Sequence, residues 1–296
     1  MLGGPVVRQH YVEFIRGTGV KLDGVVDGTS TNGPWTWVVP KDVATIFVTG
    51  VGAGGGGGSS GSPSTPSARG NGGGGSGVGA IFLECAVSPG ANLTVTVGAK
   101  GAATVSGGAS TITNLVLSPF DNTTTLDLKG GGSNAVLSAT TGGTGANSGY
   151  ALGVGGTPPS NAATPAVGNP NGLGYFAPIL GGYVLAAGGS SCGGASTNGA
   201  TAGESGGLNP ATSWLHSMFL QTPTAGTGDQ TGTLSRSGGG LGGSSIIGYG
   251  GNGGNAATNG NDATGYGAGG GGAGGYNATG GSGSDGYIGI FYWSAD

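Results

Sequence analysis

Uninterrupted glycine runs constrain the fold of this chain more than any other feature of its sequence. Glycine fills residues 54–58 and 72–75, within a total of 77 glycines in 296 residues. Glycine does not recur at every third position, which excludes a collagen triple helix. Fixing a glycine in regular structure costs about 0.5–1 kcal/mol more than fixing an alanine. Summed over the chain, this exceeds the net stability of about 5–15 kcal/mol of a folded domain. An ordered chain therefore needs a stabilising interaction that only glycine permits.

The missing Cβ atom of glycine allows backbones to approach one another closely. An extended left-handed helix with three residues per turn makes no internal hydrogen bonds. Such helices, packed side by side, can bond to one another at a net gain of about 0.5–1.5 kcal/mol per bond. We therefore expect an all-β, β-sandwich-like domain with tightly packed glycine loops or polyglycine-type helices. The alternative is a β-domain whose long glycine loops are disordered.

Short apolar and β-branched segments predict the strands that frame the glycine runs. Leu93, Val95 and Val97 alternate with threonines, which is the clearest two-residue period in the chain. The other candidate strands are rich in Val, Ile, Thr and aromatic residues and cover residues 6–16, 35–40, 43–51, 78–87, 111–117, 125–128, 135–137, 183–187, 244–247 and 286–293. Residues 209–220 are a helix candidate, because Asn209 suits the cap position and Pro210 the first helical position.

Composition divides the chain into two parts. Residues 1–34 hold six of the 20 charged side chains. We interpret them as an N-terminal segment that attaches the protein to a partner, and an ordinary first strand is an equally good interpretation. The side chains expected to make the attachment are Arg8, His10, Tyr11, Phe14 and Arg16. Residues 35–296 form the glycine-rich β domain, with a long glycine-rich insertion at about 130–285 and a closing strand at 286–293.

Charge and hydropathy exclude several classes of protein. No apolar run approaches the 18 or so residues of a membrane-spanning helix, and no early segment has the pattern of a signal peptide. The chain has eight basic and 12 acidic residues and a formal net charge of -4. A nucleic-acid-binding protein needs a basic stripe, which these scattered residues do not form.

The sequence carries no convincing catalytic or metal-binding motif, and we expect neither an enzyme nor a cofactor. Gly-x-Ser-x-Gly occurs around Ser59, Ser191 and Ser205, but about two matches arise by chance at this glycine content and none joins an apolar strand to a helix. His10 and His216 lie far apart, whereas a zinc site needs several closely spaced ligands.

Two acidic residues and two cysteines are the remaining candidates for a catalytic or redox role. Asp121 and Asp127 are the best carboxylate pair for a glycosidase, and we interpret them as solvated charges at a strand edge. Cys85 lies in a predicted strand, so we expect a buried free thiol. A disulfide between Cys85 and Cys192 stays open, because two isolated cysteines form no disulfide framework.

Several short motifs follow one another in a fixed order along the chain. They are Trp35-Thr-Trp-Val-Val-Pro40, Ile46-Phe-Val48, a glycine run, Gly77-Val-Gly-Ala80, Pro89-Gly90, Val95-Thr-Val-Gly98, further glycine runs and the strand Gly286-Tyr-Ile-Gly-Ile290. This order resembles the glycine-rich domain of bacteriophage tail fibres and tail-tip adhesins. The resemblance covers roughly residues 35–293 and rests on the ordered set of motifs, since a single glycine run is nearly uninformative.

The resemblance implies a structural virion protein of a tailed phage, a tail fibre or fibre tip that binds the host cell surface. It implies a homotrimer assembled in the host cytoplasm. Its partners would be other tail proteins, through the N-terminal segment, and a bacterial surface glycan or outer-membrane protein. The alternatives are a head fibre or capsid decoration protein without receptor contact, and a polysaccharide-degrading tailspike.

Aromatic side chains are the natural receptor anchors in a chain with so few charges, because they give a large contact area at low entropic cost. The candidates are Tyr150, Tyr175, Phe176, Trp214, Phe219, Tyr249, Tyr266 and Tyr276. Several of them can instead pack against glycine layers or a second subunit. For Trp35, Trp37 and Trp293 we expect a role in the core.

Overall fold

The computed structural model shows an all-β protein. It describes residues 7–26, 31–60, 70–116, 123–134, 238–275 and 277–295, and the backbone of five short strands between these ranges. No helix occurs among the described residues, and thus none that is long and apolar enough to cross a membrane. The expected fold class is confirmed. The helix candidate at 209–220 and the strand candidate at 135–137 lie outside the described residues.

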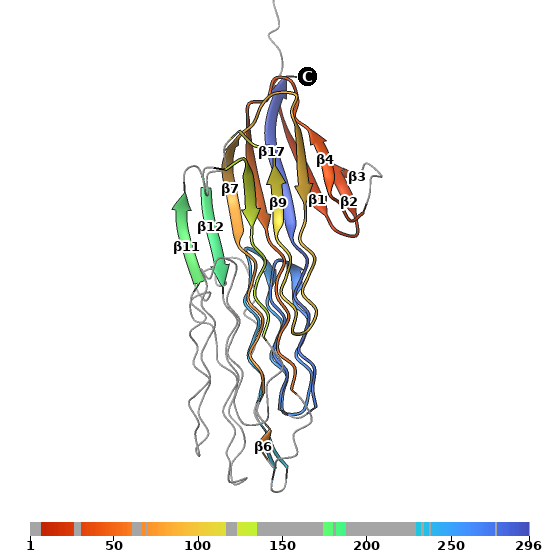
Figure 1. Ribbon diagram of the computed structural model, residues 1–296, viewed down its shortest axis with the longest axis vertical. Coiled ribbons are helices and arrows are strands. Elements are labelled where there is room, and N and C mark those ends of the chain that lie inside the picture. Colours follow the sequence, from red (N-terminus) through yellow and green to blue (C-terminus); the bar gives the residue numbers. More distant parts are fainter. Residues whose placement is uncertain are drawn as a thin grey trace, which may run out of the picture.

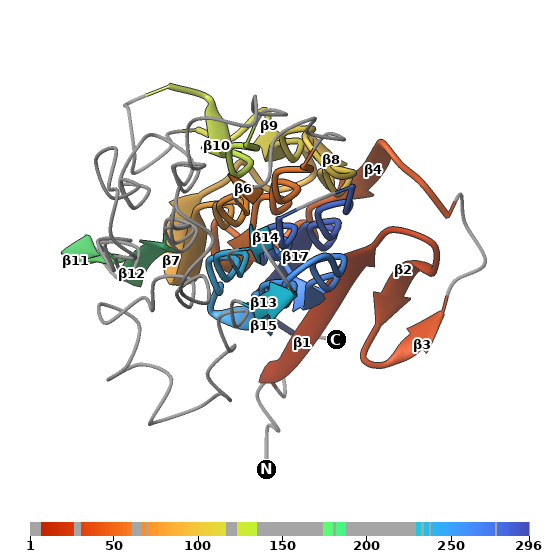
Figure 2. The same ribbon diagram turned by 90° about the horizontal axis from the view of Figure 1, so that it is seen from below.

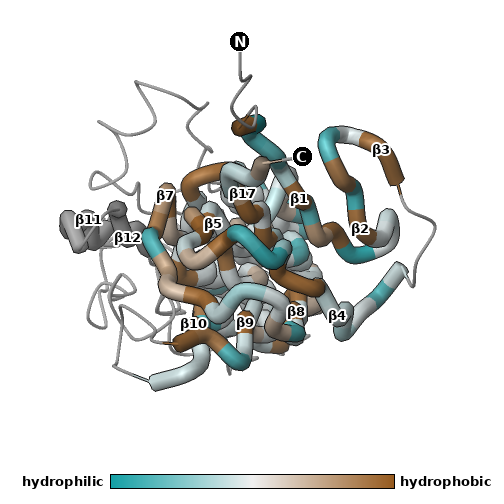
Figure 3. Tube along the Cα trace, turned by 90° about the horizontal axis from the view of Figure 1, so that it is seen from above, coloured by the Kyte–Doolittle hydropathy of each residue, from teal (hydrophilic) through white to brown (hydrophobic). Residues whose placement is uncertain are grey.

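Two antiparallel sheets form the upper layers of the molecule (Figures 1 and 3). The eight-stranded sheet has the order β11 (Gly174–Ile179), β12 (Gly182–Ala187), β7 (Gly79–Ala86), β5 (Thr45–Val51), β17 (Tyr287–Ala295), β1 (Val7–Ile15), β2 (Gly19–Leu22) and β3 (Val25–Val26). The four-stranded sheet has the order β10 (Thr125–Leu128), β9 (Ser110–Thr113), β8 (Asn92–Thr96) and β4 (Trp35–Val38).

Short strands lie outside these two sheets. The hairpin of β15 (Ile247–Tyr249) and β16 (Thr264–Tyr266) is antiparallel. A three-stranded sheet holds β13 (Asp229–Thr231), β14 (Leu234–Arg236) and β6 (Ser67–Ala68), and its β14–β6 pair is parallel. Most predicted strands match observed ones to within a few residues, but the strand expected at 111–117 ends at Thr113.

The core lies between the two large sheets. Strand alternation places one set of side chains on the inner face of each sheet, and the buried cluster joins residues of both sheets. Ile46, Leu83 and Ile290 come from the eight-stranded sheet, whereas Leu93 and Ile112 come from the other. Each such side chain stabilises the fold by about 1.5–3 kcal/mol on full burial.

The large tryptophans and Cys85 divide between the two faces of the sheets. Trp35 is buried in the core and Trp37 packs against it, as expected. Cys85 is a buried free thiol, which confirms its prediction. Trp293 is 46% exposed, so its expected core role is wrong. The alternation along β17 buries Ile290 and Tyr292 and turns Trp293 outward.

Glycine-rich segments continue the strands downward as a second structural layer. We call residues 52–60, 70–78, 98–109, 129–134, 238–244, 250–263, 267–275 and 277–286 the glycine bundle. Its segments run along the long axis of the molecule in Figure 1 and appear end-on as small coils in Figure 2. Strand and extended helix have similar backbone angles, so the chain passes from a two-residue to a three-residue period without a sharp turn.

The segment 52–60 lies at the centre of the glycine bundle, and its N–H groups point to three neighbours in rotation. Every third N–H reaches the same neighbouring segment, with N···O distances of 2.9–3.0 Å. Gly52, Gly55 and Gly58 donate to residues 78, 75 and 72; Ala53 and Gly56 donate to residues 108 and 105; Gly54, Gly57 and Ser60 donate to residues 284, 281 and 278. The falling partner numbers show that these three neighbours are antiparallel to the central segment.

The carbonyl groups of the same segment accept from three further neighbours. The oxygens of residues 53 and 56 accept from residues 131 and 134, those of 54 and 57 from 101 and 104, and those of 55 and 58 from 270 and 273. Here the partner numbers rise, so these neighbours are parallel. Six stretches of chain thus surround the central segment, two of them from the segment 98–109, and the three-residue period matches that of an extended left-handed helix. The polyglycine-type helices expected from the sequence are present.

Glycine is required in the bundle because neighbouring backbones occupy the place of a Cβ atom. A Cβ atom on Gly56 would overlap the backbone carbonyl group of Ala102, and a Cβ atom on Gly54 would overlap the carbonyl group of Ala268. These contacts are with backbone, which cannot turn aside as a side chain can. The bundle therefore accounts for the glycine content of this part of the chain.

The N-terminal segment is part of the main sheet. Strand β1 lies between β17 and β2, and its Val7 pairs with Ala295 while Phe14 pairs with Ile288. Val7 and Ala295 thus lie at the end of the sheet that is opposite the glycine bundle (Figure 1). The composition boundary at residue 34 is not a break in the sheet, and attachment through this segment stays a prediction.

Candidate functional site

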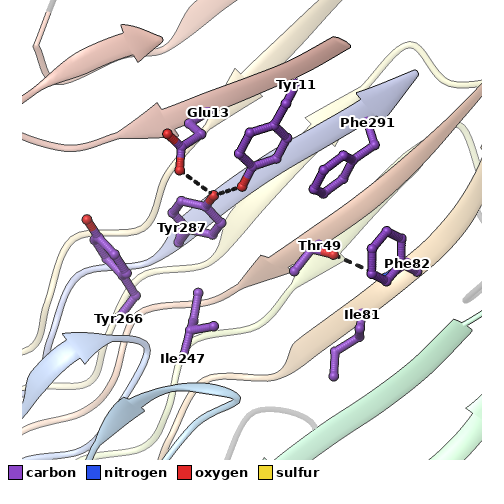
Figure 4. A pocket seen from close by; sticks show the side chains of 9 residues that line it. All are labelled: Tyr11, Glu13, Thr49, Ile81, Phe82, Ile247, Tyr266, Tyr287 and Phe291. Atoms are coloured by element: carbon purple, nitrogen blue, oxygen red, sulfur yellow. Dashed lines mark hydrogen bonds between the residues drawn. The ribbon is translucent and has the colours of Figure 1, made fainter. Parts of the chain in front are cut away.

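A groove on the outer face of the eight-stranded sheet is the main candidate site in the described part of the chain. Its volume is about 360 Å³. Apolar and aromatic side chains from β1, β5, β7, β17 and the β15–β16 hairpin line it (Figure 4). We call these residues the outer-face groove: Tyr11, Glu13, Thr49, Ile81, Phe82, Ile247, Tyr266, Tyr287 and Phe291.

One side of the outer-face groove is a row of three aromatic rings from three strands. The ring centroids of Tyr11 and Phe291 are 4.1 Å apart, and those of Phe291 and Phe82 are 5.3 Å apart, both in stacked arrangements. On the other side, Tyr266 packs on Tyr287 at a centroid distance of 5.1 Å. Figure 4 shows Thr49 between the two sides. Contacts between rings fix each ring in place.

Phe82 reaches the outer-face groove because strand β7 has an irregularity at this point. Val48 pairs with Leu83 and Gly50 with Ala80, so Ile81 and Phe82 together face Thr49. Phe82 has a φ of 49°, in the left-handed region, and its N–H donates to the Thr49 hydroxyl at 3.1 Å. A bulky residue in this region is a true outlier that surrounding structure must hold. The bulge turns the ring outward, where it is 48% exposed.

A chain of hydrogen bonds closes one end of the groove. The phenol of Tyr287 donates to Glu13 Oε1 at 2.8 Å, and the Tyr11 phenol in turn bonds to the Tyr287 oxygen. Burial raises the pKa of the Tyr287 phenol well above 10.0, and its hydrogen bonds with Tyr11 and Glu13 raise that pKa further. Burial also raises the pKa of Tyr11. Both phenols therefore stay protonated; Tyr287 holds the Glu13 carboxylate through its hydrogen bond, and Tyr11 holds Tyr287.

Gly289 allows the two phenols to meet. It is the outer-face residue of β17 between Tyr287 and Phe291, and it pairs with Glu13 and Thr49 in the adjacent strands. A Cβ atom on Gly289 would lie 2.6 Å from the Tyr11 hydroxyl oxygen and 2.9 Å from that of Tyr287. The sequence Tyr-Ile-Gly-Ile-Phe thus places two aromatic rings outward with an open position between them.

The receptor residues expected from the sequence fall in different places. Tyr266 lines the outer-face groove, and Tyr249 is a half-buried residue of the same hairpin. Tyr175 and Phe176 belong to β11, of which only the backbone is described. Tyr150, Trp214, Phe219 and Tyr276 lie outside the described residues. Sequence reasoning missed Phe82, Phe291, Tyr287 and Glu13, although alternation along 286–293 contained a signal for two of them.

The expected attachment residues mostly make contacts within the fold. Phe14 is 1% exposed and belongs to the core, so its side chain is not at the surface. Tyr11 lines the groove, and Arg8 is exposed on β1.

His10 and Arg16 each contact an acidic side chain. The hydrogen bond from the backbone N–H of Tyr11 is the main cause that lowers the pKa of the Asp23 carboxyl. The contact with His10, whose Nδ1 lies 3.0 Å from Asp23 Oδ2, lowers this pKa further. Arg16 Nε lies 3.8 Å from Asp285 Oδ1.

The described residues hold no group of three or more potential metal ligands among His, Cys, Asp and Glu. Asp127 forms an ion pair with Lys129, while Asp121 lies outside the described residues. Burial raises the pKa of the Cys85 thiol to about 12, with a further contribution from Glu84. Such a thiol is a poor nucleophile, because only the thiolate reacts.

Comparison with known families gives one clear match. The family model of a glycine-rich domain matches residues 29–293. The chain belongs to this glycine-rich domain family. The family match covers the two sheets from β4 onward and the whole glycine bundle, whereas β1, β2 and β3 precede it. No curated protein matches the chain.

Proposed function

We propose that the chain is a structural virion protein of a tailed bacteriophage, a tail fibre or fibre tip that binds the host cell surface. The observation that carries the proposal is the hydrogen-bonded glycine bundle. Its central segment is bonded to six neighbours, so no segment can slide without breaking a row of bonds. A protein that holds a particle to a cell needs a body that resists deformation in this way. The order of sequence motifs, which resembles that of tail fibres, supports the same proposal.

The two ends of the molecule suit two tasks. Val7 and Ala295 lie at the sandwich end, and the N-terminal segment there would attach the protein to other tail proteins. The glycine bundle extends away from this end (Figure 1) and would point to the host. The receptor would be a surface glycan or an outer-membrane protein. A homotrimer would multiply weak contacts into firm attachment, because linked sites act at a high effective concentration.

Two measurements test this function. Antibodies against the purified chain should label the tail tip of phage particles in electron microscopy, and the purified chain should bind host cells and compete with phage adsorption. Label on the capsid would assign the protein to a head fibre or decoration instead. Loss of polysaccharide chain length during binding would indicate a tailspike enzyme. Labelling of no part of the particle would refute the virion assignment.

The attachment role needs a variant that keeps the sheet intact. Deleting residues 1–34 removes β1, which pairs with β17 over eight residue pairs, from Val7 to Phe14. That deletion would expose the core and could not separate attachment from folding. The exposed Arg8 offers a milder change, and Arg8→Glu should lower incorporation into particles while circular dichroism shows that the chain still folds. Normal incorporation of this variant, and of a variant lacking residues 1–6, would count against attachment through this segment.

A further inference from the structure

We propose that the outer-face groove is a saccharide-binding site, in which one sugar ring packs on the exposed Phe82 ring at the end of the aromatic row and the hydroxyls of the neighbouring sugar bond to Glu13. The proposal deepens the proposed adhesive function and rests on it for the source of the glycan, a bacterial surface polysaccharide. The site lies on the face of the sandwich, on residues of β1, β5, β7, β17 and the β15–β16 hairpin (Figure 4).

The size and lining of the groove suit a small ligand. Ligand pockets have volumes of about 300–1,000 Å³, a mostly apolar lining and a few placed polar groups. The outer-face groove has a volume of about 360 Å³, and its polar groups are the phenols, the Thr49 hydroxyl and the Glu13 carboxylate. It therefore fits one or two sugar rings and is too small for a folded partner protein to enter.

The aromatic row gives a surface for the apolar side of a sugar. A pyranose ring presents axial C–H groups on its faces, and such groups pack favourably on aromatic rings. Phe291 is stacked between Tyr11 and Phe82, at centroid distances of 4.1 and 5.3 Å. The surface that this row offers to a sugar is therefore the exposed Phe82 ring at its end. Each ring is held by its neighbour, so little conformational entropy is lost when a ligand packs against the row.

Glu13 distinguishes a sugar from a purely apolar ligand. A carboxylate has two oxygens with about four acceptor sites, and the Tyr287 phenol uses Oε1. Adjacent hydroxyls of a sugar are donors that suit a carboxylate fixed in this way, and hydrogen bonds to a charged acceptor are stronger than neutral ones. An apolar peptide side chain would bury the carboxylate without such donors, which is unfavourable.

The strained backbone of Phe82 supports a binding role for its ring. A left-handed φ is disfavoured for a bulky residue, and strained residues cluster at ligand-binding sites. The strained Phe82 is 48% exposed, so the strain does not serve to bury the ring in the core. Thr49 supports the strained peptide directly, because its hydroxyl accepts the Phe82 N–H.

Saccharide binding is tested by titrating the full chain with methyl glycosides of the common hexoses and N-acetylhexosamines, and with oligosaccharides released from host polysaccharide. Saturation-transfer NMR detects the weak binding expected for single sugars. We expect Phe82→Ala to weaken the binding of the best ligand about tenfold, the effect of losing one packed aromatic ring. Glu13→Gln should weaken it as well, because the charged acceptor is lost.

The matched control is Trp293→Ala. Trp293 is an exposed aromatic residue of the same sheet face, 46% exposed and packed on Phe47, but it does not line the groove. This variant should bind the saccharide as the parent does. Melting temperatures of all variants show whether a loss of binding reflects unfolding.

The outcomes separate this proposal from the adhesive function. Absence of saccharide binding, or equal losses in Phe82→Ala and Trp293→Ala, would overturn the saccharide site even if the chain binds cells. A lower oligomeric state of Phe82→Ala in analytical ultracentrifugation, with saccharide binding unchanged, would show instead that the groove is an interface between copies. Saccharide binding that depends on Phe82, without any cell binding, would keep the site and refute the adhesive function.

Discussion

The hydroxyl of Ser110 donates a hydrogen bond of 2.8 Å to the carbonyl oxygen of Val51. Ser110 begins β9 in the four-stranded sheet, and Val51 ends β5 in the eight-stranded sheet. The same hydroxyl accepts the N–H of Gly98 at 3.0 Å. Ser110 is fully buried, so one side chain joins both sheets at the level where strands pass into the glycine bundle.

We expect Ser110→Ala to lower the free energy of unfolding by about 2–4 kcal/mol. The variant leaves the buried N–H of Gly98 without its acceptor, which costs about 1–3 kcal/mol, and removes the hydrogen bond to the Val51 carbonyl, worth about 0.5–1.5 kcal/mol. Urea denaturation followed by tryptophan fluorescence measures the change. Ser88→Ala is the control, because Ser88 is exposed in a turn and should tolerate the change. Equal stabilities of the two variants would contradict the bridging role of Ser110.

The glycine bundle should be intolerant of a single methyl group. We expect Gly56→Ala to lower the free energy of unfolding by more than about 3 kcal/mol, because overpacking against movable side chains already costs about 1–3 kcal/mol and here the neighbour is the Ala102 backbone. Gly90→Ala is the comparison. Gly90 has open space around it but a φ of 75°, so only backbone strain of about 1–2 kcal/mol applies.

The deuterium uptake of these two variants checks the mechanism. In Gly56→Ala, amides of the central segment and of its six neighbours should exchange faster together, since each depends on the others for its hydrogen bonds. In Gly90→Ala, faster exchange should stay close to the turn after β7. Slow exchange throughout the glycine bundle of Gly56→Ala would show that the bundle does not need glycine at this position.

At position 82 a glycine variant should be more stable than an alanine variant, which reverses the usual order of stability in a strand. Glycine in a strand is normally less stable than alanine by about 0.5–1 kcal/mol. At a φ of 49°, glycine avoids the strain of about 1–2 kcal/mol that alanine has. Both variants lose the same ring, so Phe82→Gly should unfold at a higher urea concentration than Phe82→Ala. The normal order at this position would mean that the bulge rearranges when the ring is removed.

The Cys85 thiol should make stability fall in alkaline solution. Its folded pKa is about 12, against an ordinary value of 9.0. The unfolded chain therefore loses this proton first, and the stabilisation that is complete below pH 9 is lost as pH rises from 9 to 12. The slope approaches about 1.4 kcal/mol per pH unit for one group. Tyr11 and Tyr287, whose pKa values are also raised, add a loss above pH 10.

Cys85→Ala separates the thiol from the phenols. The slope of unfolding free energy between pH 8 and pH 10 should be flatter in this variant than in the parent. In a Cys192→Ser background, Cys85 should react with a disulfide reagent at pH 8 roughly a thousandfold more slowly in the folded than in the urea-unfolded chain, since its thiolate fraction falls by that factor. Rapid reaction in the folded chain would contradict the burial of Cys85.

The fold could be largely predicted from the sequence because both of its parts depend on local patterns. The alternation of Leu93, Val95 and Val97 predicted β8 and its buried face, and all three side chains are in the core. The glycine runs predicted packed polyglycine-type helices from an energetic requirement alone. The partners of each segment could not be predicted, because any glycine segment can bond to any other of the same period.

The outer-face groove was less accessible to sequence reasoning. It depends on the register that sets Thr49 opposite Gly289 and on the bulge at Phe82, and neither leaves a local pattern. Phe82 has neighbours that are typical of an ordinary strand. Trp293 was expected in the core, although the two-residue alternation that buries Ile290 and Tyr292 puts Trp293 on the opposite face.

The rotation of hydrogen bonds around residues 52–60 has a consequence for how such a domain can change in size. A segment in this packing needs from its neighbours only a backbone of the same period, and no particular side chains. A further pair of antiparallel glycine segments can therefore form hydrogen bonds with the outermost segments of the glycine bundle. The β-sandwich need not change when segments are added, so one sandwich can present loops of very different length and sequence at the far end of the glycine bundle.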